Sequence, residues 1–176
     1  MSYTIKLCLF IFVFGSTFSA PLHAIQSPYA GEQNRVISAL SPKQIQGLLA
    51  GRGLGYAKVA ELNSFPGPMH VLELAEQLEL TDNQLQQTQA LMEEVKAEFR
   101  KLGKDLIDAE TKLESMFKSG EIREQDVVEQ LKAIAMIEAR LRGAHILAHV
   151  KQKDMLTPSQ IQKYDVLRGY TSQEKH

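Results

Sequence analysis

Cysteine and tryptophan are almost missing from this chain. Its 176 residues include one cysteine, Cys8, and no tryptophan. A lone cysteine cannot close a disulfide within the chain, so the small secreted domains that disulfides hold together are excluded. The stability of the fold must therefore come from another source.

Recognisable catalytic groups are also missing. The chain has no Gly-x-Ser-x-Gly motif and no evident catalytic carboxylate pair. Gly51-Arg52-Gly53-Leu54-Gly55 is not a phosphate-binding loop, because no strand pattern precedes it and no Gly-Lys-Ser/Thr follows. We interpret this stretch as a flexible break between helices. We expect a protein that binds and does not catalyse, with no required cofactor.

Neither sign of charge dominates. The chain has 20 basic and 21 acidic residues, a balance that argues against a general nucleic-acid-binding protein. Long apolar runs are confined to the start, where Leu7–Phe18 follows Lys6 and precedes small residues. This pattern is typical of a secretory signal and is short for a membrane span. We predict cleavage after Ala24 and a periplasmic protein with no transmembrane span; the alternative is an uncleaved anchor.

The remaining chain predicts one all-α domain. Residues 1–24 form the signal, 25–40 a mobile lead-in, 41–170 the helical domain and 171–176 a tail. Within the domain we expect a short helix from 41, a glycine-rich break, and a second short piece through Tyr56–Leu62. A turn at 63–68 then precedes a helix of about ten residues from Met69 to Glu79, and the last short helix runs from Pro158 to about Tyr170.

The central stretch, residues 81–153, contains no proline and predicts a long antiparallel helical hairpin. Apolar residues recur in steps of four and three on each side of Ser119-Gly120, which is a stop signal. The first seam is Thr88, Met92, Val95, Phe99, Leu102, Leu106, Ala109, Leu113 and Met116. The second is Val127, Leu131, Ile134, Ile137, Leu141, Ala144 and Ala148.

A single seam buries little apolar surface. Small helical proteins without disulfides often complete their core with a partner, so we expect a homodimer. The alternative is that the short flanking helices fold over the hairpin.

Three segments share a helix-start pattern: Leu40-Ser41-x-x-Gln44, Leu80-Thr81-x-x-Gln84 and Leu156-Thr157-x-x-Gln160. The hydroxyl accepts a free backbone N–H, and the glutamine three residues later returns a bond to the cap, which makes a capping box. The pattern therefore has a structural explanation that needs no ligand.

The two Leu-Thr-x-x-Gln copies, at Leu80–Gln84 and Leu156–Gln160, bracket the predicted hairpin of an exported chain. In this the sequence resembles the Spy/CpxP family of periplasmic stress proteins, a group that includes ZraP-type and CnrX-type metal-responsive members. The resemblance covers roughly residues 70–170. It implies a cradle-shaped helical dimer that holds unfolded proteins without ATP or reports to envelope stress systems, and that binds metal in some members.

His145 and His149 are a candidate metal site. Imidazoles four residues apart share a helix face and bind Zn²⁺ or Cu²⁺. If the hairpin turns near Gly120, Glu94, with Glu93 and Glu98, faces this pair, and the helix that follows residue 68 could bring His70 close. The alternative is a surface pair without metal.

A client-binding face is the other candidate site. Several apolar side chains fall off the heptad line, and a basic cluster could attract acidic segments. The apolar set is Leu91, Ile107, Phe117, Val128 and Met136, and the basic set is Arg100, Lys101 and Lys104. The first hypothesis is a chaperone or stress adaptor that binds partly unfolded proteins or a membrane sensor protein. The alternatives are a heavy-metal sensor or buffer, and a purely structural helical protein.

Overall fold

The computed structural model describes residues 27–171, and these contain helices and no strand. The predicted signal, with Cys8, and the tail from residue 172 lie outside them. Of the described residues, 27–31 belong to a separate N-terminal unit, and the fold below concerns the unit from Glu32 onward. Its elements are η1 Glu32–Asn34, α1 Pro42–Ala50, α2 Lys58–Glu61, α3 Pro68–Glu73, α4 Asp82–Ser119, α5 Glu124–Asp154 and α6 Pro158–Leu167. The all-α class is therefore confirmed.

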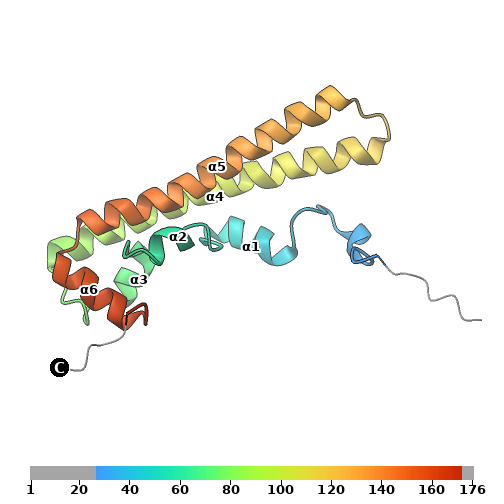
Figure 1. The fold of residues 1–176 in the computed structure, drawn as a ribbon. Coiled ribbons are helices and arrows are strands. Elements are labelled where there is room, and N and C mark those ends of the chain that lie inside the picture. The colour runs from blue at the N-terminus through green and yellow to red at the C-terminus, as the bar shows by residue number, and fades with distance from the viewer. Residues whose placement is uncertain (1–26, 172–176) are drawn as a thin grey trace, which may run out of the picture. The chain divides into compact units, whose positions relative to one another are not determined.

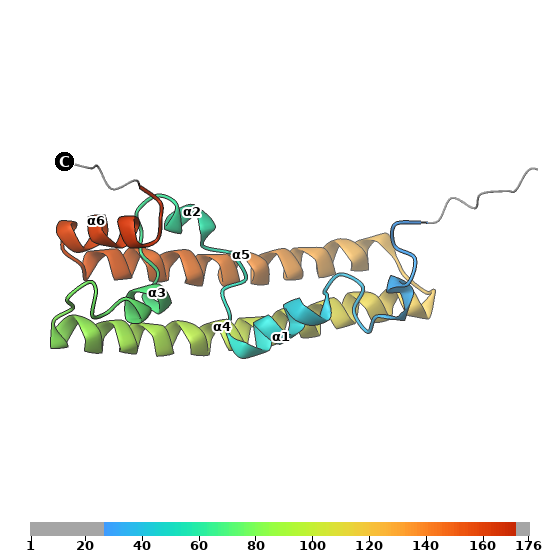
Figure 2. The same ribbon diagram turned by 90° about the horizontal axis from the view of Figure 1, so that it is seen from below.

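The long antiparallel hairpin is confirmed by α4 and α5, which lie side by side in Figures 1 and 2. Gly120 ends α4 with a left-handed backbone at φ 71°, a conformation that glycine adopts without strain. The first seam buries Phe99, Leu102 and Leu106, and the second buries Ile134, Leu141 and Ala148.

The predicted seam of the second helix is wrong at one position. Leu131 is 49% exposed, and its neighbour Gln130 is buried instead, where its side-chain amide donates to the carbonyl of Ala109 at 2.7 Å. An α-helix drifts against a strict seven-residue repeat, so the seam has moved by one residue near the start of α5.

The short helices cover one side of the hairpin (Figure 1). α1 packs on α4, α2 on α5, and α3 on both. The part of the lead-in closest to α1 belongs to this layer, because Ile37 and Leu40 are buried in the core with Phe99 and Leu141. The prediction of a mobile lead-in is therefore wrong for residues 37–40, because two of their apolar side chains are buried between the hairpin and α1.

A second small core closes the open end of the hairpin. Val71, Leu78, Leu156 and Tyr164 pack together there. The predicted helix from Met69 to Glu79 is shorter than expected, since α3 ends at Glu73. Residues 74–80 form turns, with Glu79 at φ 53°, because the chain must reverse before α4 begins at its cap, Thr81.

All three capping boxes are formed, at Ser41, Thr81 and Thr157. The two Leu-Thr-x-x-Gln copies also meet each other. The Gln84 amide donates to Gln160 Oε1 at 2.8 Å, and the Gln160 amide is 3.1 Å from Gln84 Oε1. Leu80 and Leu156 join the second core nearby. The repeated motif therefore ties the start of α4 to the start of α6.

Candidate functional site

His145 and His149 lie on α5 with their ring centroids 5.7 Å apart. The His145 ring also meets the Phe99 ring edge-on at 5.6 Å, and Phe99 contacts Tyr56, whose ring centroid is 6.0 Å away. Four rings therefore form an aromatic row between the hairpin and the short-helix layer, in the order Tyr56, Phe99, His145 and His149. The histidine pair is one end of this row.

Residues 50–55, which we name the glycine strap, press against this row. A Cβ at position 53 would overlap the His145 ring, so only glycine fits there. Burial, and then the charge of His149, lowers the pKa of His145 to about 4, although a hydrogen bond with the Gly53 backbone acts in the opposite direction. His145 is thus held neutral, and its Nδ1 is buried without a hydrogen-bond partner.

His149 connects to a carboxylate that the sequence did not suggest. Its Nδ1 donates to the carbonyl of Phe65 at 2.7 Å and lies 3.6 Å from Oε2 of Glu61. Oε1 of Glu61 accepts from the Tyr164 hydroxyl and from the Tyr170 hydroxyl at 2.9 Å. Burial, followed by the hydrogen bond to Glu61, raises the pKa of Tyr164.

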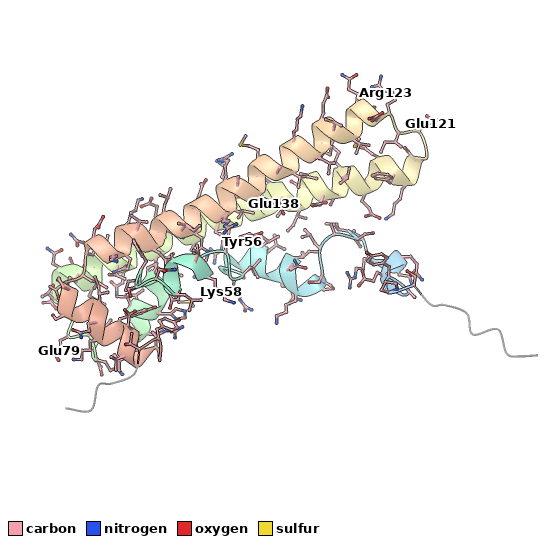
Figure 3. All side chains as sticks on the ribbon, in the orientation of Figure 1. Tyr56, Lys58, Glu79, Glu121, Arg123 and Glu138 are labelled. Carbon is pink, nitrogen blue, oxygen red and sulfur yellow. The ribbon has the colours of Figure 1, made fainter. Side chains whose placement is uncertain are left out.

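A cleft of about 860 Å³ opens between the glycine strap, α2, the start of α3 and the hairpin. Figure 3 labels Tyr56 and Lys58 on the segment that crosses the hairpin here. Burial, and then the charge of Glu138 on α5, raises the pKa of Tyr56. The cleft is lined by three histidines, His70, His145 and His149, by basic side chains, and by apolar side chains, chiefly Leu54, Leu62, Met69, Met92, Val95 and Phe99.

The structure does not gather the four predicted metal ligands. His70 pairs with Glu73 at 2.9 Å, and Glu94 pairs with Lys151 at 3.0 Å across the hairpin. In the part of the chain that the structure describes, no three histidine, cysteine or acidic side chains lie close enough to hold a metal. Of the predicted set, only His145 and His149 lie together, and Glu61 is the carboxylate nearest to them.

The predicted client contacts divide into two groups. Val128 and Met136 on α5 are 43% and 64% exposed, and Phe117 is 60% exposed. Leu91 is 4% exposed and Ile107 packs against the core, so these two contacts are wrong. The short-helix layer widens the buried stripe of α4 beyond the heptad seam, which explains both.

Only one member of the predicted basic cluster lies at the cleft. Arg100 lines the cleft, whereas Lys101 and Lys104 are exposed outside it. Lys104, one turn beyond Arg100, forms an ion pair with Asp108 at 2.7 Å. Of these three residues, Arg100 is therefore the one that can act on a ligand in the cleft.

The side of α5 that faces away from the core is unusually apolar. Exposed positions away from Ile134, Leu141 and Ala148 make up what we name the outer face of α5: Val128, Met136, Ala139, Leu147 and Val150, with Leu131 at its edge. The corresponding side of α4 carries Glu93, Lys101 and Asp108 and is polar, as expected of a surface helix. Large exposed apolar patches usually mark interaction sites.

No family model, no curated protein and no solved structure matches this chain. Between residues 27 and 171, no helix has both the length and the hydropathy that a membrane span requires. The assignment of function therefore depends on the geometry of the cleft and of the outer face of α5.

Proposed function

We propose that this is an exported, ATP-independent binding protein of the Spy/CpxP kind, acting in the periplasm as a chaperone or stress adaptor. Its partners are apolar segments of partly unfolded proteins or of a membrane sensor. The observation that carries the proposal is the outer face of α5, where Leu147 is 58% and Met136 64% exposed. A chaperone that works without ATP holds its client by passive binding, and passive binding requires exposed apolar surface of this kind.

The composition of the outer face suits a variable partner. Met136 has a flexible, polarisable side chain that adapts to differently shaped apolar groups. Ala139, at the middle of the face, allows a client backbone to approach α5 closely. Lys132 and Arg142 are exposed beside these residues and would favour client segments that also carry acidic groups.

The test introduces charge on each side of the hairpin. Met136→Glu with Leu147→Glu should abolish the suppression of light scattering by a chemically unfolded client, without ATP. Ala90→Glu with Ala97→Glu, on the exposed side of α4, is the matched control and should act like the unchanged protein. Equal activity of both variants, or no suppression even by a large excess of unchanged protein, would refute the proposal.

A second copy of the chain is the competing occupant of this face. Antiparallel pairing of two α5 helices would place the acidic first turn, with Glu124 and Asp126, against the basic last turn, with Lys151 and Lys153. Light scattering at increasing concentration detects the proposed homodimer. If the protein is a dimer and Met136→Glu/Leu147→Glu makes it dissociate, the outer face of α5 is the dimer interface. Client binding to that face would then be contradicted.

Metal binding is the second candidate function. It is favoured by the adjacent rings of His145 and His149 and by two buried atoms without hydrogen bonds, His145 Nδ1 and Glu61 Oε2. Titration calorimetry with Zn²⁺ and Cu²⁺ should give binding that His145→Ala/His149→Ala removes and His70→Ala leaves unchanged. Equal affinity of the unchanged protein and the double variant would exclude these ligands.

A further inference from the structure

The proposed function leaves the cleft beside the glycine strap without a role. Its volume of about 860 Å³ is in the range of sites that bury most of a small ligand, roughly 300–1,000 Å³. Its walls come from the strap, α2, α3, α4 and α5, so the whole fold contributes to it. The outer face of α5 lies on the opposite side of that helix.

The apolar part of the cleft follows α4. Met92, Val95 and Phe99 are spaced by three and four residues and so form one stripe along the helix. Leu54 and Met69 face them from the short-helix layer and are 40% and 48% exposed. Met92 and Val95 are half-buried and Phe99 is 1% exposed, so a hydrocarbon chain along this stripe would cover the exposed parts of Met92 and Val95 on one side and of Leu54 and Met69 on the other.

The charged part of the cleft is cationic and unpaired. Its basic residues are Arg52, Lys58, Lys96 and Arg100, and none of the ion pairs formed within residues 27–171 includes any of them. Lys104, one turn beyond Arg100 but outside the cleft, does have an acidic partner. The single acidic residue that lines the cleft, Glu61, is already bound by Tyr164, Tyr170 and Arg168.

Three of these basic residues, Arg52, Lys96 and Arg100, lie together at one opening of the cleft. The strap crosses α4 at Gly51, where a Cβ would lie 2.9 Å from Cγ of Lys96 and 3.2 Å from Cγ of Arg100. Arg52 is the next residue of the strap. The stems of Lys96 and Arg100 therefore flank the strap beside the Val95–Phe99 part of the apolar stripe, and the charged ends of such stems remain free to meet an anion.

We propose that the cleft binds a fatty acid, with the hydrocarbon chain along Met92, Val95 and Phe99 and the carboxylate at Lys96, Arg100 and Arg52. A peptide fits less well, because its backbone N–H and C=O groups would need partners and the lining offers mainly apolar and cationic side chains. A fatty acid has one polar group, at one end, which matches an apolar stripe with a cluster of cations beside one part of it.

The experiment compares ligands that share one chain and differ in the head group. Dodecanoate, dodecanol and dodecyltrimethylammonium are titrated into the purified protein below their aggregation concentrations. Dodecanoate should bind at least about tenfold more tightly than dodecanol, and the cationic ligand more weakly still. Lys96→Gln/Arg100→Gln should remove the preference for dodecanoate, whereas Lys101→Gln/Lys104→Gln, on the same helix but outside the cleft, should keep it.

Two further measurements make the result decisive. Val95→Trp, verified as folded by circular dichroism, should fill the cleft and weaken all ligands. Lys96→Gln/Arg100→Gln should still suppress client aggregation, which separates this site from the outer face of α5. Equal affinities for the three ligands, a preference that survives Lys96→Gln/Arg100→Gln, or binding only where the ligand aggregates would each overturn the proposal.

Discussion

At the scale of single residues, His145 is a titratable group that the fold keeps neutral. The glycine strap and Phe99 both pack against its ring, and His149 is the titratable neighbour that opposes a second positive charge. Protonation of His145 would place a charge in a mainly apolar row, in which the nearby carboxylate, Glu61, lies against His149. Lowering the pH should therefore weaken the packing of the glycine strap and Phe99 against His145.

We predict that stability falls as pH drops from 6.5 toward 4. The pKa of His145 is about 4 in the folded protein against an ordinary value of 6.5, so in this window the unfolded chain binds the extra proton. After a discount for partial exposure, the loss should be on the order of 2 kcal/mol. Thermal unfolding measured at pH 7.5 and 4.5 tests this. The difference between the two pH values should shrink in His145→Gln; the same difference in both proteins would show that another group is responsible.

The paired glutamines give a second prediction. Gln84 and Gln160 bond to each other as well as to their own caps, so replacing one leaves the other partly unsatisfied. A double-mutant cycle with Gln84→Ala and Gln160→Ala should give a coupling free energy of about 1 kcal/mol.

Gln44 is the matched control for this cycle. It forms the same local capping box, but its side chain bonds to no other motif in residues 27–171. Gln44→Ala combined with Gln84→Ala should be additive. Coupling of the same size in both cycles, measured by urea unfolding, would mean that capping alone explains the motif.

At the scale of helices, two glycines that both lie inside a long helix have opposite roles. Gly103 in α4 faces α1, where an added Cβ would lie 2.9 Å from the carbonyl oxygen of Leu48. Gly143 in α5 has no atom within 4 Å of such a Cβ. One glycine is therefore needed for packing, and the other weakens its helix with no compensating contact.

We predict that Gly143→Ala stabilises the protein by about 1 kcal/mol, the difference in helix propensity. Gly103→Ala gains the same propensity but must displace α1, so it should lower the melting temperature. Circular dichroism melts of the two variants are the measurement. A Gly103→Ala variant as stable as Gly143→Ala would show that α1 does not pack on α4 as described.

The helices themselves could be predicted because their signals are local. The seams of Phe99 and Leu141 and the three capping boxes follow from residues a few positions apart. The cleft could not be predicted in the same way. Glu61 meets Tyr164 and Tyr170 across more than a hundred residues, and glycines read as a flexible break do not reveal that one of them lies against His145. Long-range contacts of this kind have no periodic signal.

At the scale of the whole molecule, the covering layer is uneven. Short helices and the 37–40 segment extend along the hairpin to Glu114, whose carboxylate accepts from the Ser38 backbone at 3.0 Å. Beyond that point, toward the turn at residues 120–123, the hairpin has little core, because no residue from 115 to 129 is buried. The exposed side chains of Phe117 and Val128 lie in this bare end.

This unevenness predicts a gradient of local stability along the hairpin. Amides in residues 115–130 should exchange with deuterium much faster than those around Phe99 and Leu141, because fewer buried contacts must be broken to open them. Hydrogen-exchange mass spectrometry measures both ends in one protein. Gln130→Ala, which removes the bond to the Ala109 carbonyl, should speed exchange at the tip and leave the covered end unchanged. Uniform exchange along α4 and α5 would show that the hairpin opens as one unit, and the bare end would then have no special freedom to adapt to a client.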